Sequence, residues 1–62
     1  MKIAVVGLGN IGFSILSHIN HKFPNSVIGI DIDSNLVEKL RNNGYRVTTD
    51  YRALTGIDVW LL

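Results

Sequence analysis

The sequence has no cysteine, a single proline and no long apolar run. Without cysteine it can form neither a disulfide nor a thiolate metal site. No apolar run approaches the roughly 18 residues that a membrane-spanning helix needs, and residues 1–12 do not have the pattern of a signal peptide. We therefore expect a cytoplasmic protein without a membrane partner.

Excess charge of either sign is also missing. Six basic and five acidic residues give a net charge of +1, and no basic cluster stands out. Nucleic acid is therefore not an expected partner. Apolar side chains, in contrast, make up 47% of the 62 residues. This composition excludes disorder and suggests strands that are covered on both faces, although a chain this short buries only about 60% of its unfolded surface.

Short apolar runs between turn residues predict four strands. The runs at residues 3–6 and 27–30 are continuous and indicate buried strands. Residues 45–49 predict a short edge strand. The run from residue 57 to residue 62 predicts a fourth, buried strand, in which Trp60 is expected to belong to the core.

Two helices are expected between these strands. From Asn10 to about Lys22 the period changes, and Ile11, Ile15 and Ile19 recur every four residues with Leu16 beside them. A second, shorter helix is expected between the capping residues 33–35 and the stop at residues 43–44. A brief helical turn at residues 51–54 precedes the last strand.

This order predicts an α/β fold with a Rossmann-type parallel sheet and right-handed crossovers. It matches the first β-α-β-α-β-β portion of a doubly wound domain. The sequence ends within an apolar run, and exposed strand ends fray. We therefore expect residues 1–62 to be part of a dinucleotide-binding domain, with the remainder of that domain and a substrate domain absent.

The strongest functional signal is GLGNIG at residues 7–12, which fits G-x-G-x-x-G. It follows a predicted strand and opens a predicted helix, as the dinucleotide-binding fingerprint requires. Gly7 permits a sharp turn, Gly9 allows a pyrophosphate to approach the backbone, and Gly12 permits close packing of the helix on the strand. The amides of the first helical turn, with Asn10 and Ile11, complete the expected pyrophosphate contacts.

An acid stands at the end of the next strand, as the fingerprint also demands. Asp31 is expected to accept hydrogen bonds from the adenosine ribose, with Ile32 beside it. Its carboxylate repels a 2′-phosphate, and no basic residue follows before Lys39 and Arg41. The sequence therefore predicts NAD rather than NADP as cofactor. The competing hypothesis is a set of ordinary turn glycines with an acid at a strand end and no ligand.

No residue predicts catalysis or metal binding. His18 and His21 have no Asp, Glu or second His at a ligand spacing, so we interpret them as solvated helix positions. Asp33 is interpreted as a helix cap rather than a ligand. Gly29 has two open interpretations, a close backbone approach or a packing role.

The opening MKIAVVGLGNIG, followed by VIGIDID at residues 27–33, VTTD at 47–50 and DVWLL at 58–62, resembles two dehydrogenase families. One is the nucleotide-sugar dehydrogenases, of the UDP-glucose and GDP-mannose type. The other is the β-hydroxyacid and 6-phosphogluconate dehydrogenase group, whose fingerprint resembles GLGNIG more closely and whose spacing after Asp31 is similarly short. Residues 11–14 also resemble prephenate dehydrogenases.

The first resemblance implies an NAD-binding fragment of an oxidoreductase that acts on CH-OH groups. The family's catalytic Cys and Lys lie far downstream, so the fragment is expected to be inactive alone. The complete enzyme would act on a nucleotide sugar and would be a homo-oligomer.

A resemblance of another class remains open. NAD-sensing regulatory domains of potassium transporters and channels share a GLG-type loop, an acid after the second strand, and a pattern like that of residues 40–50. Those modules usually have a glycine-acid pair at the end of the third strand, where this chain has Thr49-Asp50. This resemblance implies a non-enzymatic domain in which bound NAD shifts a conformational equilibrium.

Overall fold

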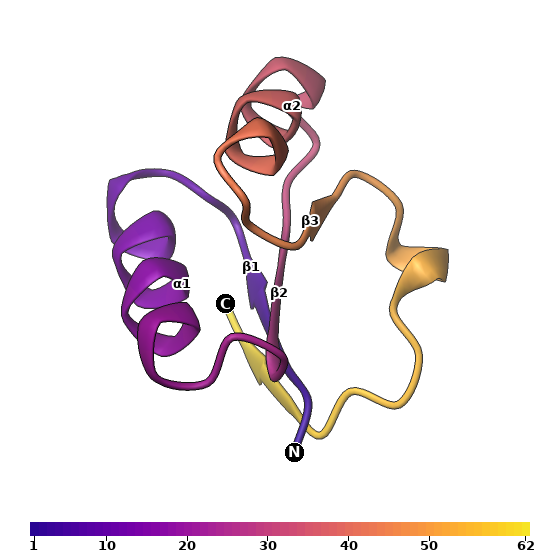
Figure 1. The fold of residues 1–62 in the computed structure, drawn as a ribbon. Coiled ribbons are helices and arrows are strands. Elements are labelled where there is room, and N and C mark those ends of the chain that lie inside the picture. Colours follow the sequence, from indigo (N-terminus) through magenta and orange to yellow (C-terminus); the bar gives the residue numbers. More distant parts are fainter.

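A four-stranded parallel sheet lies at the centre of the computed structural model, which describes all 62 residues (Figure 1). The strand order is β3-β2-β1-β4, and all three neighbouring pairs are parallel. The elements in chain order are β1 (Ile3–Val6), α1 (Asn10–Lys22), β2 (Val27–Ile30), α2 (Ser34–Asn42), β3 (Val47–Thr48), the 3-10 helix η1 (Tyr51–Ala53) and β4 (Val59–Leu61). The predicted α/β fold with a Rossmann-type parallel sheet is confirmed.

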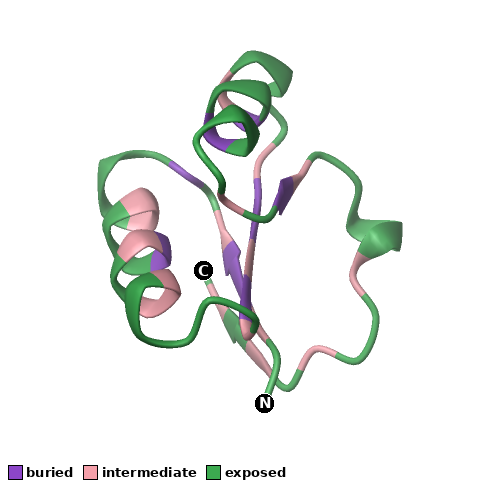
Figure 2. Cartoon of the chain, in the orientation of Figure 1, coloured by how far each residue is buried: buried purple, intermediate pink, exposed green.

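Both α-helices pack on one face of the sheet and share one hydrophobic core. Side chains alternate between the two faces of a strand, so every second strand residue points toward the helices. The core residues are Val5, Leu8, Leu16, Val27, Val37, Leu40 and Val47. Figure 2 shows these buried positions on the strands and on the inner sides of the helices. Neither helix is long and apolar enough to cross a bilayer.

The second sheet face has a thinner cover. The connection from β3 to β4 runs on the opposite side of the sheet from α1 and contains only the single turn η1 (Figure 1). Ala4 and Ile30 are still buried there, but Trp60 is 46% exposed and Leu62 is 98% exposed. The expectation of a buried fourth strand with Trp60 in the core is therefore wrong, because β4 is an edge strand whose outer side no element covers.

Two local predictions also need correction. On α1 the buried residue is Leu16, with Phe13 and Ile19 partly buried beside it, whereas Ile11 is 80% exposed. The helix thus rests on the sheet through an i, i+3, i+6 row rather than through the every-fourth row of isoleucines.

The predicted strand at residues 45–49 is only two residues long, Val47–Thr48. Tyr45 turns instead toward α1, where its ring packs edge-on against Phe13 with centroids 5.3 Å apart. Its hydroxyl lies 3.3 Å from the Ser17 hydroxyl and donates to it.

Two glycines determine how α1 leaves the sheet. Gly7 has a φ of +89°, which a side chain opposes, so the chain turns sharply at the end of β1. Gly12 lies directly against this turn, and a Cβ added there would overlap the Gly7 carbonyl oxygen. Gly29 serves packing, because the side chains of Leu8 and Leu16 occupy the space where its Cβ would be.

We predict that Gly12→Ala and Gly9→Ala differ sharply in stability. Backbone cannot move aside as a flexible side chain does, so G12A should lower the free energy of unfolding by at least about 1–3 kcal/mol. Gly9 has an ordinary φ of −68° and no atom within 4 Å of an added Cβ, so G9A should cost less than about 1 kcal/mol. Urea unfolding followed by circular dichroism measures both, and equal stability would contradict the tight contact.

Candidate functional site

The glycine loop and Asp31 meet at the edge of the sheet formed by the carboxyl ends of β1 and β2. The two strands run parallel with Val6 opposite Ile30, and the Gly7 amide donates to the Ile30 carbonyl at 2.9 Å. Parallel neighbours end at the same edge, so the loop after β1 and the acid after β2 are brought together.

The first turn of α1 presents backbone amides that no protein group accepts. Its N-cap is Gly9, which has no side chain to accept from them, and the amides of residues 10–12 donate to no acceptor in the chain. The helix dipole adds roughly half a positive charge at this end. Nothing in the protein occupies the space beside Gly9. A phosphate group fits these donors and this space.

Asp31 links the glycine loop to the end of β2. One carboxylate oxygen, Oδ2, accepts the Leu8 amide at 2.8 Å, and the other, Oδ1, accepts the Asp33 amide at 2.9 Å. These two hydrogen bonds hold the pKa of Asp31 below its ordinary value of 3.8, and the bond from Leu8 has the larger effect. Each carboxylate oxygen has a second lone pair, so the ionised group can still accept from a ligand hydroxyl.

A hollow opens beside this carboxylate on the helix-free side of the sheet. It is lined by Val6, Gly7, Ile30, Asp31, Ile32 and Tyr51. Ile32 is 90% exposed and Tyr51 is 54% exposed, which is unusual for large apolar side chains next to a polar group.

Sequence reasoning missed Tyr51. The only signal was its position, just after the end of β3 and therefore at the same sheet edge as Asp31. Asp50 caps η1 by accepting the Arg52 amide at 2.9 Å, which fixes the turn that carries Tyr51.

Every residue proposed from the sequence as a cofactor contact lies at this one edge. These residues are Gly7, Gly9, Asn10, Ile11 and Gly12 in the loop and first helical turn, and Asp31 and Ile32 after β2. Their individual contacts with a cofactor stay predictions. His18 and His21 are both exposed, and no three His, Asp or Glu side chains gather anywhere as metal ligands.

Fold and site together define a Rossmann-type nucleotide-binding domain. The TrkA-N domain family matches residues 3–55. Because this match covers most of the chain, the protein belongs to the TrkA-N domain family, the NAD(H)-binding regulatory domains of potassium transport systems. Comparisons with curated proteins and with solved structures find no match.

The assignment to a nucleotide-sugar dehydrogenase is therefore wrong, and with it the expected oxidoreductase activity and sugar-nucleotide substrate. The same finding replaces the β-hydroxyacid, 6-phosphogluconate and prephenate alternatives. The resemblance to NAD-sensing domains of potassium transporters was the better interpretation, despite Thr49 in place of the usual glycine.

The lowered pKa of Asp31 predicts how stability depends on pH. A carboxyl whose pKa is lower in the folded chain stabilises the fold above its unfolded-state pKa, and this contribution is lost as the pH falls through the folded-state value. Between about pH 4 and pH 2, the free energy of unfolding should therefore fall more steeply in the unmodified chain than in Asp31→Asn. Urea titrations across that range measure the difference, and parallel slopes would show that Asp31 does not hold the loop.

Proposed function

We propose that this chain binds NAD(H) at the edge formed by the glycine loop and Asp31, and that the bound nucleotide regulates a potassium transport protein. The observation that carries this proposal is the pairing of uncapped α1 amides with a carboxylate held 2.8 Å from the Leu8 amide. The first group suits a diphosphate and the second a ribose. Membership of the TrkA-N domain family supports the regulatory role.

The proposed orientation assigns one part of the nucleotide to each feature. The diphosphate lies over Gly9 and accepts from the amides of residues 10–12. The adenosine ribose donates its hydroxyls to Asp31. The adenine ring enters the hollow between Ile32 and Tyr51. When bound, NAD(H) reports the cell's redox state, and the chain itself supplies binding and orientation.

The site favours NAD over NADP. A 2′-phosphate would lie beside Asp31, which is ionised because its amide partners lower its pKa. Arg52, which directly follows Tyr51 in the sequence, forms an ion pair with Asp50 at 3.2 Å. Lys39 and Arg41 lie in the last turn of α2, away from its N-terminal end beside Asp31. No cation at the ribose position therefore offsets the repulsion.

A regulatory domain needs only a difference in affinity between two conformations. We propose that the domain faces the cytoplasm and that its partner is a membrane transport protein, in place of the expected parent without a membrane partner. Assembly as a homo-oligomer and the expectation that residues 1–62 are part of a larger domain stay predictions.

Isothermal titration of the chain with NAD⁺, NADH, NADP⁺ and NADPH tests the proposal. We expect binding of NAD⁺ and NADH, and at least about tenfold weaker binding of the phosphorylated pair. Gly9→Ala places a methyl group where the diphosphate lies, so it should abolish binding while circular dichroism shows an intact fold. Equal binding to G9A, or no NAD(H) binding by the unmodified chain, would refute the site.

Tyr51 provides a test of the adenine position. Stacking of a base on an aromatic ring contributes about 1–3 kcal/mol, so Tyr51→Ala should weaken NAD(H) binding about tenfold or more. Tyr51→Phe keeps the ring and should bind as the unmodified chain does. If Y51A binds equally well, the adenine lies elsewhere.

A further inference from the structure

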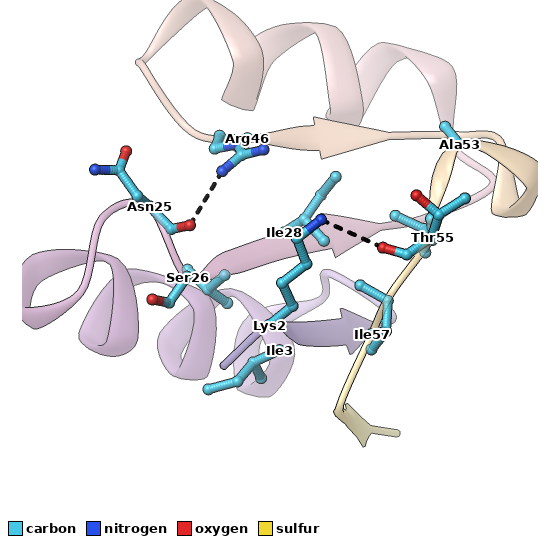
Figure 3. Close-up of a pocket in the computed structure, with 11 residues that line it drawn as sticks. Lys2, Ile3, Asn25, Ser26, Ile28, Arg46, Ala53, Thr55 and Ile57 are labelled. Atoms are coloured by element: carbon cyan, nitrogen blue, oxygen red, sulfur yellow. Dashed lines mark hydrogen bonds between the residues drawn. The ribbon is translucent and has the colours of Figure 1, made fainter.

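A second hollow lies at the opposite end of the sheet, where the strands begin (Figure 3). Lys2 immediately precedes β1, Ser26 precedes β2, and Arg46 precedes β3. The loop at residues 53–57 closes the hollow from the side that η1 occupies. Asp31 and the glycine loop stand at the other ends of β1 and β2, so this hollow is separate from the proposed nucleotide site.

The hollow is positively charged. Its eleven lining residues include two cations, Lys2 and Arg46, and no acid. Lys2 Nζ donates to the Thr55 carbonyl at 3.5 Å, and Arg46 donates to the Asn25 carbonyl at 3.2 Å. Neither cation forms an ion pair, because the only ion pair in the structure joins Arg52 to Asp50. Each therefore keeps further donors for an anion.

Asp58, which follows the lining residue Ile57, forms no ion pair with either cation. Asp58 Oδ2 accepts the backbone amide of Lys2 at 2.8 Å, and Asp58 is not among the lining residues. The Lys2 side chain instead extends toward Thr55 (Figure 3).

The remaining lining is largely apolar. Ile28, Leu54 and Ile57 are each partly exposed and contribute to the hollow. Such a combination suits a ligand with an apolar body and a single anionic group. Arginine and lysine both form charge-assisted hydrogen bonds with carboxylates, which are stronger than those between neutral groups.

We propose that this hollow is a second ligand site, for a small carboxylate with an apolar body. The carboxylate lies between Lys2 and Arg46, and the apolar part rests against Ile28, Leu54 and Ile57. The site is independent of the proposed NAD(H) function, since it shares no residue with the nucleotide site.

The test titrates the ¹⁵N-labelled chain with phenylacetate and follows amide chemical shifts. We expect saturable shifts at residues 26–28 and 53–57. Phenylacetamide has nearly the same shape without the charge. Its affinity should be at least about tenfold lower, as expected for loss of one charge-assisted contact. Acetate, which lacks the apolar body, should also bind about tenfold more weakly.

The variant pair Lys2→Met and Arg46→Met, combined in one chain, should lose the phenylacetate shifts. The backbone bonds of Lys2 and Arg46 to Asp58, Val59 and Gly29 stay in place, and the side-chain bonds that are lost reach only the loop carbonyls of Asn25 and Thr55, so the fold should survive. Lys22→Met, on the exposed end of α1, is the matched control and should bind normally. NAD(H) binding should be unchanged in both.

Scattered or non-saturating shifts, or equal binding of phenylacetate and phenylacetamide, would overturn the second site. So would normal phenylacetate binding by the double variant. If the unmodified chain binds phenylacetate but not NAD(H), the proposed function is refuted and the second site stands. The two proposals can therefore be rejected independently.

Discussion

The hydrogen bond between Asp31 and the Leu8 amide is the contact on which the nucleotide site depends. It joins residues 23 positions apart in the sequence, at 2.8 Å, and fixes the glycine loop against the end of β2. The Gly7 amide bond to Ile30 and the packing of Leu8 also hold the loop, but this hydrogen bond is the one that ties it to Asp31. The same carboxylate is the proposed ribose acceptor, so one group both shapes the loop and contacts the ligand. A ligand that competes for Asp31 must therefore leave the Leu8 contact in place or displace the loop.

The close approach of α1 to the sheet sets up the other half of the site. Gly12 lies against the Gly7 carbonyl, and this brings the start of the helix to the sheet edge with its amides uncapped. In α2 two of the three corresponding amides are satisfied, because Asp33 Oδ1 accepts from Asn35 and Leu36. Two helices of the same small domain thus begin in opposite ways. Exposed backbone donors are tolerated at a helix start because water can satisfy them, and at α1 a phosphate can replace that water.

Much of the fold could be predicted because its signals are local. The continuous apolar runs of β1 and β2, the caps before α2 and the glycines after β1 each act within a few residues. The burial of Trp60 and Ile11 was predicted wrongly because it depends on what covers each side chain. Residue type alone does not reveal that β4 is an edge strand, or that α1 faces the sheet with the row Phe13, Leu16 and Ile19. Tyr51 escaped notice for a similar reason, since only the parallel topology brings it to Asp31. The family was misassigned because GLGNIG describes a phosphate cradle that dehydrogenases and regulatory domains share.

The same cradle can serve either role because binding and chemistry make different demands. A hydride-transferring enzyme must hold the nicotinamide against a substrate, whereas a regulatory domain needs the nucleotide to prefer one conformation. In the proposed orientation, every group at this site contacts the adenosine diphosphate half: amides for the diphosphate, a carboxylate for the ribose and two exposed side chains, Ile32 and Tyr51, beside it. Contacts of this kind can distinguish occupied from empty states. The nucleotide can shift the partner's conformation only by the difference in its affinity for the two states. If Asp31 accepts the ribose as proposed, it supplies a route to such a difference, because its hydrogen bond from the Leu8 amide then links ribose binding to the position of the loop.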